Sequence, residues 1–112
     1  MDRKVYSYIG LCQKAGRLKS GEGACVAAIS KKEAVLVIIS EDASDNTKKK
    51  FLNKAKYYGI DCYVKGSRGD LSSAIGKANR PVVAITDRGL AEKIKEYLLN
   101  GIEHGGVRIC QK

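Results

Sequence analysis

The chain has 112 residues, 44% of them hydrophobic, and a formal net charge of +9 at pH 7. Its length fits one domain, and its hydrophobic content excludes a wholly disordered chain. No apolar run approaches the ~20 residues of a membrane-spanning helix, and residues 1–10 lack the apolar core of a signal peptide. We therefore expect a cytoplasmic protein without a membrane partner.

The N-terminal part of the chain predicts a helix, an edge strand and a second helix. Apolar residues recur at helical spacing over Arg3–Lys14, and Gly16 is expected to end that helix. Arg17–Ser20 is short and half polar, which is typical of an edge strand. Ser20 stands where a helix cap belongs. The buried face of the helix that follows is predicted to contain Ala24, Val26, Ala27 and Ile29 or Ala28.

The rest of the chain alternates strands and helices. Residues 34–40 (AVLVIIS) form a continuous apolar run, the pattern of a strand buried on both faces. Ser44 is expected to cap a helix that ends at Gly59. The remaining predicted elements are a strand over Asp61–Val64, a helix from Asp70 (cap) to Ile75, a strand over Val82–Thr86 and a helix from Asp87 (cap) to Asn100. Residues 103–112 fit either a strand or a loose arm.

This alternation predicts an α/β fold in which helices cover both faces of a mixed, mostly parallel sheet. We expect one domain over residues 1–100, followed by a C-terminal tail over residues 101–112.

The positive charge is large for a domain of this size and indicates an anionic partner. Nucleic acid fits best, because no predicted helix pairs a bulky apolar face with a purely cationic one, as membrane-surface helices do. A charge that serves solubility alone is the simpler alternative.

The cysteines do not have the spacing of a metal site. Cys12, Cys25, Cys62 and Cys110 form no CxxC pair, and His104 stands alone. We expect reduced thiols, no metal and no cofactor, with the first three cysteines acting as small core residues.

The first candidate site is Gly21–Gly23 (GEG), which opens a predicted helix behind a short strand. It superficially resembles a dinucleotide fingerprint, but Val26 occupies the position where Gly or Ala is needed for close packing. A flexible turn is the simplest interpretation. We favour a third one, in which N–H groups at the helix start bind an RNA phosphate beside Lys14, Arg17 and Lys19.

An acidic pair and a lysine run are the other charged features of the sequence, and neither is predicted to form a specific site. Glu41 and Asp42 could bind Mg²⁺, but no nucleophile, further acid or His accompanies them, so we favour shaping of the turn and capping of the following helix. Lys48–Lys50 are consecutive helix residues that point about 100° apart. With Lys54 and Lys56 they are expected to form a solvated face that attracts nucleic acid nonspecifically.

The second candidate site is the loop Gly76–Pro81 (GKANRP), which combines a flexible start, two cations, an amide and a rigid end. Such a loop can hold a base by stacking or hydrogen bonding. An ordinary connection is the alternative.

Three segments carry a family resemblance: IGLCQKAGRLKSGEG, AVLVIISEDASDNTKKK and AIGKANRPVVAITD. They resemble the YlxQ-like bacterial members of the kink-turn RNA-binding ribosomal-protein superfamily, which includes the archaeal L-seven-Ae and the eukaryotic L-thirty-e proteins. The resemblance covers about residues 3–99. It implies a three-layer α/β/α sandwich with a four-stranded mixed sheet, and RNA binding by two neighbouring loops. These loops contain the two candidate sites.

The family's specificity residues carry over only in part. Archaeal members use a Gly-x-Asn-Glu-x-x-Lys pattern to read tandem sheared G·A pairs in a kink-turn. Gly21 matches the glycine, but the Asn, Glu and Lys positions fall on Gly23, Ala24 and Ala27. Phosphate and shape contacts survive this loss, whereas base readout is expected to be weaker or different.

We therefore expect an RNA-binding, ribosomal-protein-like monomer without catalysis, which recognises structured, kink-turn-like RNA. Ribosomal RNA and ribosomal or translation proteins are its expected partners. The predicted RNA-binding residues are Lys14, Arg17, Lys19, Ser20, Gly21, Glu22, Lys77, Asn79 and Arg80. Two alternatives stay open: a protein that recruits RNA for a separate RNA-modifying enzyme, and a protein–protein adaptor in translation.

Overall fold

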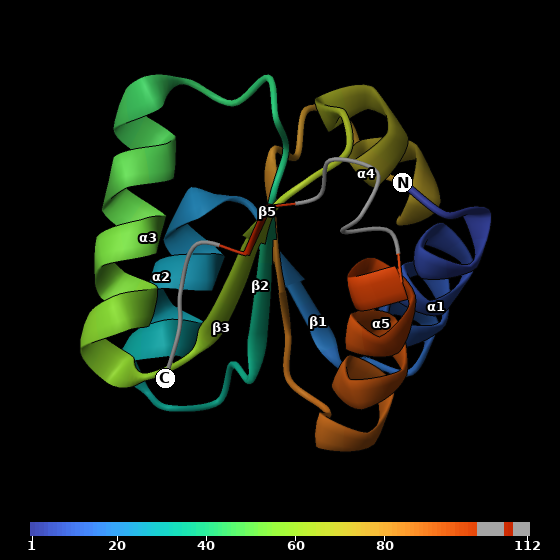
Figure 1. The fold of residues 1–112 in the computed structure, drawn as a ribbon, viewed down its shortest axis with the longest axis horizontal. Helices are drawn as coiled ribbons and strands as arrows, with labels where there is room; N and C mark the ends of the chain where they lie inside the picture. The colour runs from blue at the N-terminus through green and yellow to red at the C-terminus, as the bar shows by residue number, and fades with distance from the viewer. Residues whose placement is uncertain (101–106, 109–112) are drawn as a thin grey trace.

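A computed structural model describes residues 1–100 and 107–108, with side-chain environments for residues 1–99. Helices and strands alternate in the described part of the chain, as predicted (Figure 1). In chain order they are α1 (Arg3–Lys14), β1 (Leu18–Ser20), α2 (Glu22–Ser30), β2 (Leu36–Ile39), α3 (Asp45–Tyr58), β3 (Asp61–Val64), α4 (Arg68–Ala74), β4 (Val82–Ile85), α5 (Arg88–Asn100) and β5 (Val107–Arg108). None of these helices is long and apolar enough to cross a bilayer.

The sheet is mixed, with the strand order β1-β4-β2-β3-β5. All four predicted strands take part, and β1 is an edge strand as expected. The two-residue β5 pairs with the end of β3 and falls within the tail, whose other residues lie outside the described part.

The expectation of a mostly parallel sheet is wrong. Only the β2–β3 pair is parallel among the described strands, while β4 runs antiparallel to both β1 and β2. The reason is the length of α4. Its seven residues span ~10 Å, so the chain does not return to the far end of the sheet before β4 begins.

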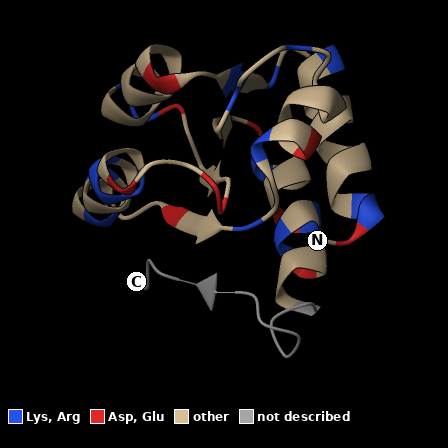
Figure 2. Cartoon of the chain, turned by 90° about the horizontal axis from the view of Figure 1, so that it is seen from above, with Lys and Arg blue, Asp and Glu red and all other residues tan. Residues whose placement is uncertain are grey.

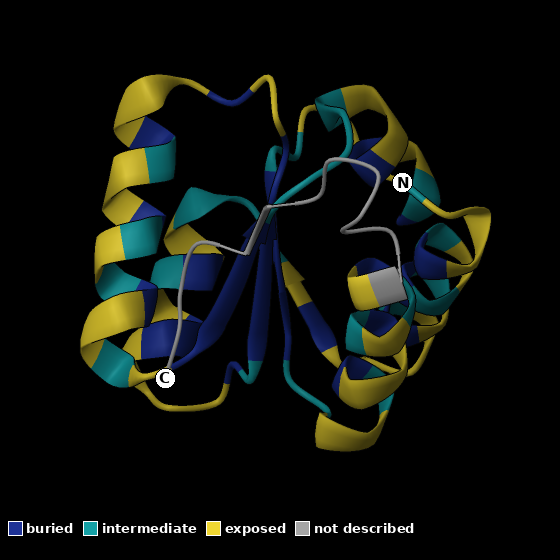
Figure 3. Cartoon of the chain, in the orientation of Figure 1, coloured by how far each residue is buried: buried dark blue, intermediate teal, exposed yellow. Residues whose placement is uncertain are grey.

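Helices cover both faces of the sheet, which confirms the three-layer α/β/α prediction (Figure 1). Helices α2 and α3 pack on one face, and α1, α4 and α5 on the other. The buried centre and the exposed outer helix faces are separated clearly in Figure 3. Strand β2 shows why its sequence is apolar throughout: Leu36 and Ile38 face the α1 side, and Val37 and Ile39 face the α2 side.

Helix α3 begins and ends as predicted. The Ser44 hydroxyl accepts a hydrogen bond from the Thr47 N–H (3.1 Å), and Gly59 closes the helix in the left-handed conformation, with φ of 69°.

Ser20 and Asp70 do not have the capping roles that were predicted for them. The N-cap of α2 is Gly21, one residue after Ser20, and no side chain caps it. The N-cap of α4 is Ser67, whose hydroxyl accepts from the N–H of Asp70 (3.0 Å). Asp70 therefore lies inside the first turn of the helix that it was expected to cap.

The buried face of α2 agrees with the prediction at Ala28 and Ile29, and Val26 packs against the core, but two other positions differ. Cys25, Ala28 and Ile29 pack against the sheet, while Ala24 and Ala27 are exposed. Small residues occur on both sides of this helix, so the sequence pattern alone did not distinguish the buried face from the exposed one.

The strand register brings four connections to one end of the sheet, which we call the loop pole. Ser20 at the end of β1 pairs with Val83, and Ile39 at the end of β2 pairs with both Val82 and Val64. The loop pole thus contains the segments 20–21, 40–44, 65–67 and 77–81.

Candidate nucleic-acid interface

The two candidate loops meet at the loop pole. The N–H of Gly21 donates to the carbonyl of Val82 (3.1 Å), and Nε of Arg80 donates to the hydroxyl of Ser20 (3.3 Å). The β1–α2 junction and the loop before β4 therefore form one continuous surface, although they are far apart in the sequence.

Gly21 has a backbone conformation that other residues rarely adopt. Its φ is 90° and its ψ is 156°, a region that is essentially restricted to glycine. A Cβ at this position would also stand 3.8 Å from Cδ of Arg80. The glycine therefore permits the turn that places Ser20 beside Arg80 and leaves the start of α2 without a covering side chain.

The first turn of α2 presents backbone donors. Because the N-cap is a glycine without a side-chain acceptor, no side chain caps the N–H groups at this helix start. The N–H of Gly21 itself is bonded to the sheet, so the donors are those of the next residues. This environment suits an anion, since the helix dipole adds positive potential there.

Arg80 is held by its own loop. Its backbone N–H donates to the Ser72 hydroxyl (2.7 Å), and its Nη1 donates to the carbonyl of Ala78 (2.9 Å). The side chain is partly buried, and the neighbouring Lys77 and Asn79 are exposed. The fork of the guanidinium is thus oriented along the surface that it shares with Ser20.

Arg68 connects this loop to the turn after β2. Its Nη1 donates to Oδ1 of Asn79 (3.1 Å), and its Nη2 donates to the carbonyl of Asp42 (3.2 Å). Asn79 has a left-handed backbone, with φ of 55°. Arg68 is not among the predicted site residues, because its partners come from two distant segments and no local sequence pattern indicates the contact.

Glu41 and Asp42 have the structural role that was predicted, although they act on α4 and not on α3. Glu41 accepts from the N–H of Gly66 (3.2 Å), and Asp42 accepts from the N–H of Arg68 (2.9 Å), the first residue of α4. The Ser40 hydroxyl and this N–H lower the pKa of Asp42. Both carboxylates therefore fix the turns of the loop pole.

Glu22 links α2 to α3. Its carboxylate accepts from the Thr47 hydroxyl (2.8 Å) and from Nζ of Lys50 (3.0 Å). These hydrogen bonds, first that of Lys50 and then that of Thr47, lower the pKa of Glu22. The carboxylate is engaged within the chain and offsets one positive charge beside the site.

The predicted basic residues separate into three places. Lys77 is exposed in the loop before β4, and Lys19 is exposed on β1, one residue before the loop pole begins at Ser20. Lys14 lines a hollow of about 620 Å³ between α1 and the end of α4, together with Gly76. Arg17 lies at the opposite end of β1, where its carbonyl accepts from the N–H of Thr86 (2.9 Å). Basic positions occur on both helical layers and do not form a single patch (Figure 2).

The described residues offer no cluster of side chains that could hold a metal ion. No three His, Cys, Asp or Glu side chains gather at one point within them. Cys12, Cys25 and Cys62 are all buried. Burial raises the pKa of Cys12 to about 11 and that of Cys25 to about 12, so these thiols are protonated at neutral pH.

A family model described as the Ribosomal protein L7Ae/L30e/S12e/Gadd45 family matches residues 3–95. The chain belongs to this family. It is also 40% identical over 96 residues to the RNA-binding protein YlxQ of Enterococcus faecium, and this alignment covers 86% of this chain and 92% of the relative. The RNA-binding protein YlxQ of Bacillus subtilis is 40% identical over 93 residues, and that alignment covers 83% of this chain and 93% of the relative. Neither name is that of an enzyme, in agreement with the expected lack of catalysis.

Solved structures have the same fold. A protein of unknown function from Bacillus halodurans superposes with a TM-score of 0.81 and 39% identity, covering 85% of this chain and 96% of the other. The 15.5kD RNA binding protein of Giardia lamblia superposes with a TM-score of 0.73 and 18% identity, covering 93% and 92%. The second likeness shows the shared fold alone.

Proposed function

We propose that this chain binds structured RNA at the loop pole. One observation supports this most strongly: Arg80 donates a hydrogen bond to Ser20, the residue before the uncapped start of α2, so this helix start and two basic segments share one surface. The names of the YlxQ relatives, which are described as RNA-binding proteins, point the same way.

Each residue at this surface has a specific role in the proposal. Gly21 allows the RNA backbone to approach the N–H groups at the start of α2. Lys19, Lys77 and Arg80 neutralise phosphates. Because Arg68 donates to the carbonyl oxygen of Asn79, the NH₂ group of Asn79 is left to donate to a base or a ribose.

The second part of the proposal concerns how the chain recognises the bases of its RNA. Gly23, Ala24 and Ala27 occupy the Asn, Glu and Lys positions of the family's sequence pattern. All three are exposed on α2, but they carry no polar side-chain atom. We propose that the chain prefers bent, kink-turn-like RNA through phosphate and shape contacts, with little discrimination among base pairs.

The triple variant Gly23→Asn, Ala24→Glu, Ala27→Lys tests this narrower proposal. It should gain about 1–3 kcal/mol of discrimination for an RNA with tandem G·A pairs over a matched RNA with Watson–Crick pairs there. The wild type should show little difference between the two. Strong discrimination by the wild type would contradict the assignment of these positions.

We further propose that the RNA is ribosomal, and that the chain acts as a monomer in the cytoplasm. Crosslinking the protein in cells and sequencing the attached RNA tests this part. Enrichment of ribosomal RNA, lost in a Lys19→Ala, Arg80→Ala variant, is the expected result. Enrichment of an unrelated RNA, or co-purification of an RNA-modifying enzyme that brings the RNA, would contradict it.

A further inference from the structure

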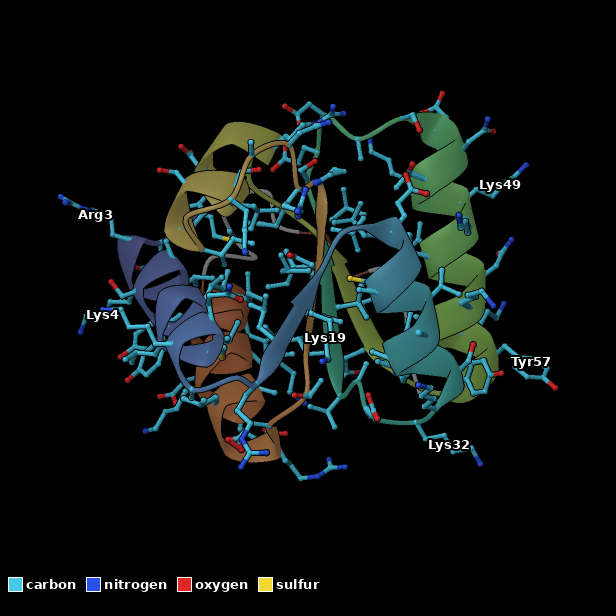
Figure 4. All side chains as sticks on the ribbon, turned by 180° about the vertical axis from the view of Figure 1, so that it is seen from behind. Arg3, Lys4, Lys19, Lys32, Lys49 and Tyr57 are labelled. Carbon is cyan, nitrogen blue, oxygen red and sulfur yellow. The ribbon has the colours of Figure 1, made fainter. Side chains whose placement is uncertain are left out.

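The outer face of α3 carries a row of exposed polar and basic side chains. Lys49, Asn53, Lys56 and Tyr57, which we call the α3 stripe, are all exposed and recur at the spacing of one helix face. Lys49 and Tyr57 both point away from the domain, on the opposite side from Arg3 (Figure 4). The stripe is ~12 Å long, from the rise of 1.5 Å per residue.

The charge of this face is not balanced within the described chain. Of the lysines in α3, only Lys50 has a carboxylate within 4.0 Å among the described residues, namely that of Glu22. Lys49 and Lys56 have no such partner there. Like charges on one helix face repel each other, so an external anion would be stabilised by this surface.

Tyr57 makes this surface more than a cluster of lysines. Its side chain is 83% exposed, the highest value among the large hydrophobic residues described. The ring meets that of Tyr58 edge to face, with centroids 5.0 Å apart and an angle of 81° between the planes. Tyr58 is partly buried and packs on the α2–α3 core. This contact can cover at most one face of the Tyr57 ring, so the other face is available for stacking.

The first half of α3 lies beside the start of α2 at the loop pole. Glu22, the first residue of α2, binds Thr47 and Lys50 in the first half of α3. The start of α2 and the first two turns of α3 are therefore neighbours. A strand that leaves the loop pole along α3 would pass Lys49 first and would then reach Lys56 and Tyr57.

We propose that the α3 stripe binds an unpaired strand of the same RNA, with Lys49 and Lys56 on phosphates and Tyr57 stacked on a base. This inference rests on the proposed RNA binding at the loop pole. Lysines attract any polyanion, but a free aromatic face beside them favours unpaired nucleic acid, because every base has a π-face that can stack. An acidic protein segment would use the charge and would leave the ring without a defined role.

The test compares two RNAs that share one structured hairpin, of which one has a single-stranded extension of about 10 nucleotides. The wild type should bind the extended RNA more tightly. Tyr57→Ala should weaken binding of the extended RNA by about fivefold or more, the effect of losing one base stack, and should leave hairpin binding unchanged. Tyr57→Phe should retain the wild-type affinity, because it keeps the ring.

The lysines are tested through the salt dependence. Lys49→Gln with Lys56→Gln should lower the slope of log K against log salt for the extended RNA by up to ~1.4, or ~0.7 for each phosphate contact on a single strand. The matched control, Arg3→Gln with Lys93→Gln, removes the same charge from exposed positions on α1 and α5 and should change the slope much less.

The outcomes separate this inference from the proposed function. If the hairpin binds and the extension adds nothing, or if Tyr57→Ala weakens both RNAs equally, the α3 stripe is not a strand-binding surface. If neither RNA binds, the proposal for the loop pole also fails. If poly-glutamate binds in a Tyr57-dependent way and more tightly than the extension, the surface belongs to an acidic protein partner instead.

Discussion

Replacing Lys19 and Arg80 by alanine should weaken RNA binding while the protein stays folded. The Arg80 guanidinium makes two described hydrogen bonds, to the Ser20 hydroxyl (3.3 Å) and the Ala78 carbonyl (2.9 Å). A net hydrogen bond contributes ~0.5–1.5 kcal/mol, so with partial exposure we expect a stability loss of about 1–2 kcal/mol. Lys19 is exposed and should add at most ~0.5 kcal/mol. The free energy of unfolding of such a domain is ~5–15 kcal/mol, so the double variant should stay folded.

The backbone hydrogen bonds that shape the site are retained in this double variant. The Gly21 N–H still donates to Val82, and the N–H of residue 80 still donates to the Ser72 hydroxyl. The expected change in binding is therefore electrostatic. Loss of two phosphate contacts should reduce the slope of log K against log salt by ~1.4–1.8.

Fluorescence anisotropy with a labelled structured RNA at several salt concentrations measures that slope, and urea unfolding measures stability. Arg3→Ala with Lys93→Ala is the control, since it removes equal charge from exposed positions on α1 and α5. A folded Lys19→Ala, Arg80→Ala protein that binds with wild-type affinity and slope would show that the loop pole is not the RNA site.

Three further predictions concern the fold. Gly21→Ala should cost about 1–3 kcal/mol in urea unfolding because of its positive φ, whereas Gly23→Ala, which meets open space within α2, should gain ~0.5–1 kcal/mol; similar effects at both would contradict the assigned turn. The folded-state pKa of Glu22 is lowered, so its stabilisation is present above its unfolded pKa of about 4.3 and is lost as pH falls through the folded value. Glu22→Gln should therefore lower the melting temperature near neutral pH. Its melting temperature should also fall less steeply than that of the wild type as the pH drops below the unfolded pKa of Glu22. A melting temperature with the same pH dependence as in the wild type would argue against the contacts of Glu22 with α3. Cys12 and Cys25 should resist a thiol reagent in the native protein at a pH of about 8, as read by peptide mass spectrometry; modification at the rate of the unfolded chain would contradict their burial.

The sequence predicted best those elements whose signals are local. Helix α3 has a serine cap, a periodic apolar stripe and a stop glycine, and its observed bounds agree. Strand β2 was found from its continuous apolar run. In both cases the local pattern and the tertiary packing favour the same structure, which is why pattern reasoning succeeded.

The errors arose where tertiary contacts decide between similar local patterns. Ser20 has the chemistry of a helix cap, but β1 pairing with β4 extends the strand through Ser20, and the cap falls on Gly21. Asp70 and Ser67 are both good cap residues, and the observed hydrogen bond selects Ser67. Strand direction was also missed, because the shortness of α4 matters only once β4 is known to lie beside β2.

In the candidate site, too, local sequence signals were recognised and tertiary contacts were missed. The two loops were identified from glycines and cations, but the contact of Arg80 with Ser20 joins segments that are far apart in the sequence. Arg68 carried no signal of its own, since its hydrogen bonds to Asp42 and Asn79 depend on three loops meeting at one pole. The placement of Arg17 at the opposite end of β1 likewise follows from strand register alone.

The central claim is that the chain binds structured RNA through phosphate contacts at the loop pole. Titration of the wild type with a structured RNA, in a salt series that begins near about 50 mM, tests it most directly. The account predicts measurable affinity at the lowest salt and a steep, linear fall of log K with log salt. No affinity at that salt, or an affinity that does not change with salt, would contradict it.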